Sequence, residues 1–153
     1  IKAVHTTEHH LVLIGKEKKY AKKLRKFILQ NKMEHQVSFL KDVNSEELAI
    51  IYQNATVFCY PSFCEGFGIP LIEALYSKLP VVVTKHGCFP EAAGPNSIYI
   101  DPFDIVEIRS VLDKLFKDPK QRKEIAEKGY DYVQQFSDEN VAKNLLNLYK
   151  SIS

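Results

Sequence analysis

One stretch of the chain reads Ser62-Phe63-Cys64-Glu65-Gly66-Phe67-Gly68-Ile69-Pro70-Leu71-Ile72-Glu73-Ala74-Leu75. It follows the apolar run of residues 57–60, which is short, rich in β-forming residues and closed by Pro61, and is therefore predicted to be a buried strand. Pro70 suits a first helical turn, and the apolar residues after it recur at helical spacing. The stretch predicts a strand, a glycine-bearing loop and a helix, in that order.

The predicted loop has the properties of an anion site with a carboxylate on either side. Gly66 and Gly68 lack a Cβ, so we expect the backbone to bend sharply there and to approach a ligand closely. Free N–H groups and the positive end of the helix dipole favour a phosphate. Glu65 and Glu73 would repel that phosphate and are better suited to accept hydrogen bonds from sugar hydroxyls. Either glutamate taken alone is equally compatible with an ordinary carboxylate that the dipole stabilises.

Strand-like runs alternate with helical patterns along the whole chain. The runs occupy residues 11–14, 37–40, 57–60, 81–83 and 98–100. Such alternation predicts an α/β fold with a parallel, doubly wound sheet. The chain then becomes helical, with patterns over residues 105–116, 121–135 and 140–152.

Two of the predicted helices carry further signals. The first has one apolar face, made by Tyr20, Leu24, Phe27 and Ile28, and one basic face. The basic face suits solvent, and it also suits the surface of anionic lipid. The second is expected to begin at a capping pair made by Asn44 and Glu47.

Length and composition indicate one ordinary globular domain over residues 1–153. The hydrophobic fraction is 45% and the charged fraction 26%, and the net charge of +2 calls for no nucleic-acid partner. The sequence has neither an apolar run of about 18 residues nor a signal-peptide pattern. The three cysteines lack metal-ligand spacing and are interpreted as reduced thiols. We therefore expect a cytoplasmic protein, with peripheral contact at the inner face of the membrane as a further expectation.

The ordered set of motifs resembles the C-terminal, donor-binding domain of retaining GT-B glycosyltransferases, glycosyltransferase family 4 in particular. Besides residues 62–75, the matching segments are residues 11–15, 80–84, 87–94, which resemble the family's glycine-then-Pro-Glu loop, and 100–102. The resemblance covers nearly the whole chain. It implies the Rossmann-like half of a hexosyltransferase that moves a sugar from a nucleotide-diphosphate sugar to an acceptor, with retention, in polysaccharide or glycolipid synthesis. A glycogen or starch synthase-like enzyme and a nucleotide-binding scaffold without turnover are the alternatives.

The resemblance also assigns roles to individual residues. Glu65 takes the catalytic position at the donor sugar, and Glu73 binds the ribose hydroxyls. The donor-binding backbone between them comprises Gly66, Phe67, Gly68, Ile69, Pro70 and Leu71. Supporting positions fall to Gly15, Lys16, His86 and Glu91, although His86 is equally compatible with a loop histidine that has no such role. The donor is a UDP-, GDP- or ADP-sugar, and no metal or other cofactor is expected.

The start of the chain departs from the family pattern. In similar enzymes an arginine-bearing strand and a loop lysine come well before the equivalent of residues 11–14, whereas only ten residues precede that run here. We therefore expect a fragment that lacks the first strand and the N-terminal acceptor domain and is inactive by itself. Residues 1–10 are expected to be the end of a helix. His5, His9 and His10 are interpreted as solvated histidines rather than as a metal site.

Overall fold

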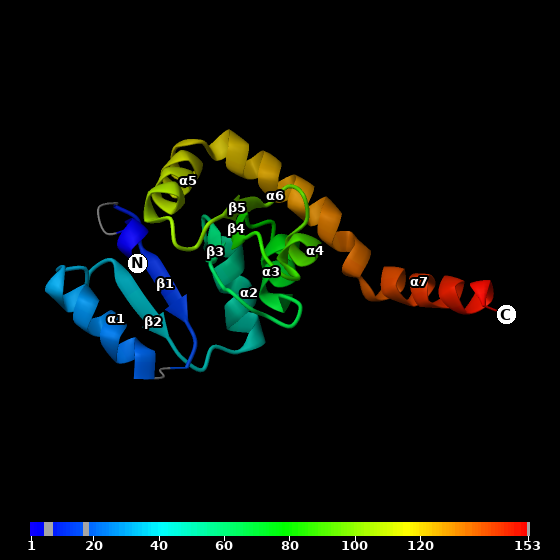
Figure 1. Ribbon diagram of the computed structural model, residues 1–153, viewed down its shortest axis with the longest axis horizontal. Helices are drawn as coiled ribbons and strands as arrows, with labels where there is room; N and C mark the ends of the chain where they lie inside the picture. The colour runs from blue at the N-terminus through cyan, green and yellow to red at the C-terminus, as the bar shows by residue number, and fades with distance from the viewer. Residues whose placement is uncertain (5–7, 17–18, 153) are drawn as a thin grey trace. The chain divides into compact units, whose positions relative to one another are not determined.

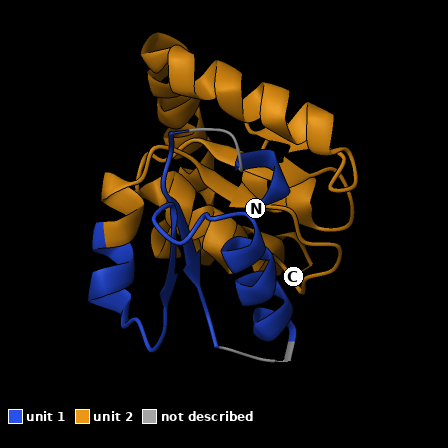
Figure 2. Cartoon of the chain, turned by 90° about the vertical axis from the view of Figure 1, so that its left-hand side faces the viewer, with its two compact units in different colours: residues 1–50 blue, residues 51–153 orange. Residues whose placement is uncertain are grey.

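A computed structural model describes residues 1–4, 8–16 and 19–152 of the chain. The chain divides into two compact units, residues 1–50 and residues 51–153 (Figure 2). All five predicted strands are present and all pair in parallel, which confirms the α/β class. They form two sheets rather than one, with the orders β1-β2 and β3-β4-β5.

The first unit is a small parallel sheet with a helix alongside it (Figure 1). Its elements are η1 (Lys2–Val4), β1 (Leu11–Ile14), α1 (Lys19–Gln30) and β2 (Val37–Leu40). Leu11 pairs with Val37 and Ile14 with Leu40. Of the apolar face predicted for α1, Ile28 is buried and Leu24 and Phe27 are half-buried, but Tyr20 is 66% exposed.

The helix α2 (Ser45–Asn54) begins where the sequence predicts. The Asn44 side chain accepts a hydrogen bond from the Glu47 amide, and the Glu47 carboxylate accepts one from the Asn44 amide, both at 2.9 Å. This reciprocal pair is a capping box, which satisfies two amides that a helix start would otherwise leave unpaired.

The second unit is a three-stranded sheet surrounded by helices. Its elements are β3 (Phe58–Tyr60), α3 (Ile69–Tyr76), β4 (Val81–Thr84), α4 (Phe89–Ala93), β5 (Ile98–Ile100), α5 (Ile105–Lys117), α6 (Pro119–Val133), η2 (Gln134–Phe136) and α7 (Asp138–Ser151). The central strand β4 is fully buried, which explains why residues 81–83 are all valine. Gly129 lets α6 pack closely on α3, because a Cβ there would lie 2.6 Å from Leu75 Cδ2.

Side-chain caps mark the starts of the last three helices. Asp104 accepts hydrogen bonds from Val106 and Glu107 at the start of α5. Asp118 and Ser137 cap α6 and α7. Both caps lie in the gaps between the predicted helical patterns, at residues 117–120 and 136–139, so those gaps are confirmed as helix boundaries. No residue of α7 is buried, and none of the helices in the described ranges is long and apolar enough to cross a membrane.

Two local predictions are wrong. In the part of residues 1–10 that the structure describes, only the 3-10 turn η1 is helical, and residues 9 and 10 are not; residues 5–7, with His5, lie outside the described residues. Residues 89–93, expected as a loop, form the short helix α4, with proline in its first turn and Gly94 as its C-cap. A five-residue helix is too short to show helical periodicity in the sequence.

Candidate functional site

The loop between β3 and α3 contains backbone N–H groups that donate no hydrogen bond within the described residues. Gly68 is the N-cap of α3, in the left-handed conformation at φ 101°, and no side chain caps the helix. Pro70 has no N–H, and the Leu71 amide donates to the Gly68 carbonyl at 2.9 Å. Within the described residues, the backbone N–H groups of residues 66–69 make no hydrogen bond. The anion site predicted at residues 66–71 is thus reduced to the N–H groups of residues 66–69.

Glu65 is held in place by two hydroxyl groups. The Tyr60 hydroxyl and the Ser62 hydroxyl both donate to Glu65 Oε1 at 2.8 Å. These hydrogen bonds, from Tyr60 first and Ser62 second, hold the pKa of the exposed Glu65 carboxyl below its usual value. Burial, followed by the hydrogen bond to Glu65, raises the pKa of Tyr60 to about 12, so this tyrosine remains a proton donor. Glu65 is therefore a fixed carboxylate whose Oε2 has no hydrogen bond within the described residues.

Glu73 is held in the same way from a different element. The hydroxyl of Tyr52, a buried residue of α2, donates to Glu73 Oε2 at 3.3 Å. Burial, and then the negative charge of Glu73, raises the pKa of Tyr52. The two tyrosines share a packing partner: Phe58 contacts the Tyr52 ring edge-on at 5.4 Å and stacks with Tyr60 at 5.6 Å. The two carboxylates are thus positioned from one aromatic cluster, Tyr52, Phe58 and Tyr60.

The loop is also fixed from the following strand. The buried Thr84, at the end of β4, donates its hydroxyl to the Ser62 carbonyl at 2.7 Å. The Cys88 thiol donates to the Glu65 carbonyl at 3.5 Å. Because β3 and β4 are parallel neighbours, their carboxyl ends lie at the same edge of the sheet. The loops that follow both strands therefore meet at Glu65, as expected for a ligand site in an α/β fold.

Of the remaining predicted site residues, two lie at or just before the start of α3 and two follow β4. Phe67 is half-buried and packs edge-on against Phe136 at 5.6 Å, while Ile69 is 62% exposed. His86 and Glu91 are exposed in the segment after β4, and the Glu91 carbonyl accepts a hydrogen bond from Tyr132.

Gly15 and Lys16 belong to the first unit. They follow β1, where the Gly15 amide donates to the Leu40 carbonyl at 3.1 Å. Both are exposed. Their predicted supporting role stays a prediction.

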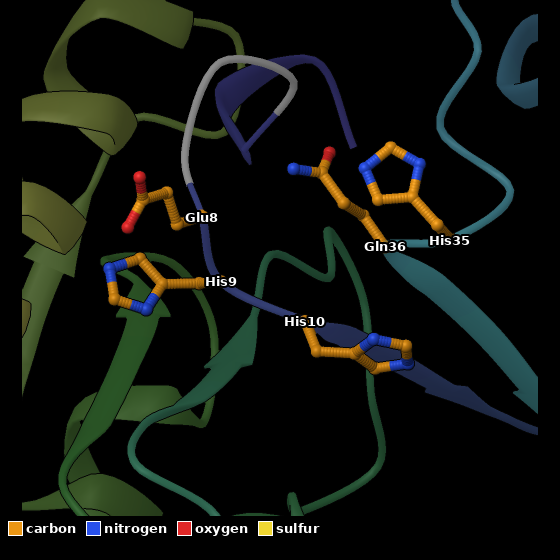
Figure 3. Close-up of a pocket in the computed structure, with 5 residues that line it drawn as sticks. All are labelled: Glu8, His9, His10, His35 and Gln36. Atoms are coloured by element: carbon orange, nitrogen blue, oxygen red, sulfur yellow. The ribbon is translucent and has the colours of Figure 1, made fainter.

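The first unit also has an open pocket lined by three histidines. Figure 3 shows His35 and Gln36 facing the segment of Glu8, His9 and His10. His10 Nε2 lies 2.8 Å from Ser38 Oγ. Among the described residues, no three histidine, cysteine, aspartate or glutamate side chains are grouped so as to hold a metal ion.

Tyr52 and Tyr60 are site residues that the sequence pattern did not predict. Both occupy positions that fit an apolar pattern, Tyr52 on a helical stripe and Tyr60 at the end of a strand. The available signal was chemical, since a buried tyrosine needs a partner for its hydroxyl. For the buried Tyr52, that partner is Glu73.

The two loop glycines are expected to respond differently to substitution. Gly68→Ala should lower the free energy of unfolding by about 2 kcal/mol, because Gly68 has positive φ and a Cβ would lie 3.0 Å from Leu71 Cδ1. Gly66→Ala should change it by at most about 0.5 kcal/mol, because its surroundings are open and its φ is not positive. The bend predicted at Gly66 is present, and alanine should tolerate it because the φ of Gly66 is not positive.

Urea unfolding of both variants measures this difference. If Gly66 is instead needed for the approach of a ligand, Gly66→Ala will weaken nucleotide binding at unchanged stability. Equal destabilisation by the two substitutions would contradict the loop geometry.

Removing the Tyr60 hydroxyl should change the acid response of the protein. A carboxyl with a lowered pKa contributes stability that is present above its ordinary value of 4.5 and is lost as the pH falls through the lowered value. Tyr60→Phe removes the largest cause of that lowering, so the pKa of Glu65 should rise and acid unfolding should begin at a higher pH. Carboxyl NMR titration measures the first effect and circular dichroism the second. Tyr76→Phe is the control, and an unchanged Glu65 pKa in Tyr60→Phe would contradict the prediction.

The chain is similar to known proteins of one family. The family model described as "Glycosyl transferases group 1" matches residues 1–132. The chain is 30% identical over 146 residues to the O-antigen chain mannosyltransferase RfbU of Salmonella typhimurium, which covers 95% of this chain and 40% of that protein. It spans only 30 to 40% of the length of the first curated relatives that it matches.

Solved structures agree with this match. The C-terminal domain of a glycosyl transferase group 1 family protein from Francisella tularensis superimposes with a TM-score of 0.78 at 29% identity, covering 88% of this chain and 75% of that one. Anabaena HepE, solved in complex with UDP and glucose, has a TM-score of 0.86 at 21% identity, covering 97% of this chain and 43% of that one. At that identity the likeness shows the fold alone.

Proposed function

Because this chain belongs to the group 1 glycosyl transferases, we propose that it binds a nucleotide-diphosphate sugar and serves as the donor half of a sugar transfer. One observation carries the proposal. A loop with unused N–H groups at residues 66–69 lies between two glutamates, each held by a tyrosine hydroxyl. Amides suit a diphosphate, and fixed carboxylates suit the hydroxyls on either side of it.

Each part of the site has a proposed role in the reaction. Glu65 orients the donor sugar through its unused Oε2, and Glu73 accepts hydrogen bonds from the ribose. The bond between the sugar C1 and the diphosphate breaks, and the N–H groups and the α3 dipole stabilise the charge on the leaving diphosphate. An acceptor hydroxyl then bonds to C1 on the face that the diphosphate left and gives its proton to the leaving diphosphate, so the configuration is retained. In this proposal the N–H groups and the α3 dipole stabilise the diphosphate charge without a metal.

The relatives guide the proposed substrates. RfbU is an O-antigen chain mannosyltransferase and HepE was solved with UDP and glucose, so a hexose donor carried by a nucleoside diphosphate is the proposed class. We propose a growing polysaccharide or glycolipid as the acceptor. Three free cysteines are consistent with a reducing compartment, so the proposed location is the cytoplasm.

Calorimetric titration tests the proposal. The chain is titrated with UDP, GDP and ADP, and then with UDP-glucose and GDP-mannose. We expect saturable binding of one nucleotide and tighter binding of its sugar conjugate. Glu65→Gln should keep the affinity for the free nucleotide and lose the gain from the sugar, because Glu65 is proposed to contact only the sugar.

The outcomes separate the proposal from its rivals. Failure of a demonstrably folded chain to bind any of the five ligands would overturn it. Binding that is unaffected by Glu65→Gln would keep the nucleotide site but remove Glu65 from the donor sugar.

A further inference from the structure

We propose that the outward face of α1 docks on a membrane surface of anionic lipid. This surface, called the α1 basic face, consists of Lys22, Lys23, Lys26 and Leu29. All four side chains are exposed, and Leu29 is 64% exposed. The face lies within the first unit, so the inference does not depend on the donor site.

The charges of the α1 basic face have no partner of opposite sign. Residues 19–30 contain no aspartate or glutamate. The ammonium groups of Lys22, Lys23 and Lys26 form no ion pair with the residues that the structure describes. Lys26 is four residues from Lys22 and three from Lys23, a spacing at which like charges repel on a helix surface. Lys22 also lies in the first turn, where the helix dipole disfavours a cation.

The repulsion among the three lysines, and the position of Lys22 near the helix start, both destabilise α1. Nothing within the helix compensates for these effects, and an uncompensated violation of local rules is typical of a functional surface. An anionic surface would relieve the repulsion.

Leu29 favours lipid over other anionic partners. It follows Lys26 by three residues and Lys22 by seven, so it lies among the lysines, whereas Ile28 is buried. The Arg25 guanidinium lies 4.4 Å from the centre of the Phe39 ring, which ties α1 to β2 with this orientation. Nucleic acid or an acidic protein would be bound through the lysine charges alone, without a role for Leu29. A bilayer makes use of both, since an apolar side chain can enter the interface while lysines contact the headgroups.

Co-sedimentation with vesicles tests the inference on the full chain. We expect binding to equal mixtures of phosphatidylglycerol and phosphatidylcholine, and none to phosphatidylcholine alone. Changing Lys22, Lys23 and Lys26 together to glutamine should weaken binding roughly a hundredfold, at about fivefold for each charge near the surface. Because the substitutions remove like-charge repulsion, the variant should fold at least as well as the parent. Raising the salt to about 1 M, where the screening length is about 3 Å, should have a similar effect.

Two comparisons make the experiment decisive. Changing Lys120, Lys123 and Lys143 to glutamine removes the same net charge elsewhere and should leave most of the binding. Leu29→Gln should weaken vesicle binding about tenfold while leaving heparin binding unchanged. Equal losses in the two triple variants, or tighter binding to duplex DNA than to the vesicles, would overturn the inference.

Discussion

Replacing Glu73 with alanine should raise the dissociation constant of the preferred nucleoside diphosphate about a hundredfold. The proposed bonds from two ribose hydroxyls to a carboxylate contribute roughly 1.5 kcal/mol each, and their sum corresponds to about two powers of ten in the dissociation constant. The Tyr52 hydroxyl already fixes Glu73 before the ligand arrives, so little side-chain entropy is lost on binding. Titration calorimetry with the preferred nucleotide measures the loss.

A 2′-deoxynucleotide tests whether the loss of binding comes from a contact between Glu73 and the ribose hydroxyls. The parent chain should bind the 2′-deoxynucleotide more weakly than the ribonucleotide, and Glu73→Ala should bind the two alike. Glu127→Ala, which removes an exposed glutamate of α6 with only a long ion pair at 3.9 Å, is the matched control. If Glu73→Ala still discriminates between the sugars, the carboxylate does not contact the ribose.

Gly94→Ala should lower the free energy of unfolding by about 3 kcal/mol or more. Gly94 has φ of 70° and ψ of 174°, a conformation that costs an alanine of order 1–3 kcal/mol. An added Cβ would also overlap the Tyr132 ring, and overpacking of this kind typically costs a further 1–3 kcal/mol. The Tyr132 ring has little freedom to move away, because its hydroxyl donates to the Glu91 carbonyl. Urea unfolding followed by circular dichroism measures the change.

Gly87 provides the control for backbone strain. It has φ of 62° but no atom within 4 Å of an added Cβ, so Gly87→Ala should cost only about 1–2 kcal/mol. The difference between the two variants isolates the contact with Tyr132. Equal losses would mean that the ring moves aside at no cost.

Local signals in the sequence predicted most of the elements correctly. The five strands are short apolar runs with clear ends, and the capping pair of Asn44 and Glu47 identified the start of α2. The strand-loop-helix order around Glu65 followed from Pro61 and Pro70 in the same way. Each of these inferences depends on residues that are close together in the chain, where propensity and hydrogen bonding act directly.

The features that the sequence did not predict depend on contacts between distant segments. Tyr52 lies 21 positions from Glu73 and Thr84 lies 22 from Ser62, so no periodicity reveals these hydrogen bonds. The burial of Gly94 against Tyr132 is likewise a tertiary contact. The division of the strands into two sheets was also missed, because strand runs alone do not show which edges pair.

The packing of Phe58 between Tyr52 and Tyr60 links the two glutamate positions, so a substitution at Phe58 affects both. Phe58 has no polar side-chain atom and contacts neither glutamate through a hydrogen bond, yet both tyrosines rest on its ring. A change at this strand position would shift both hydroxyls at once, so substitutions in the two subsites would show epistasis through Phe58. If Glu73 binds the ribose and Glu65 the donor sugar as proposed, a substitution of Phe58 would alter the binding of nucleotide and of sugar together, although Phe58 contacts neither.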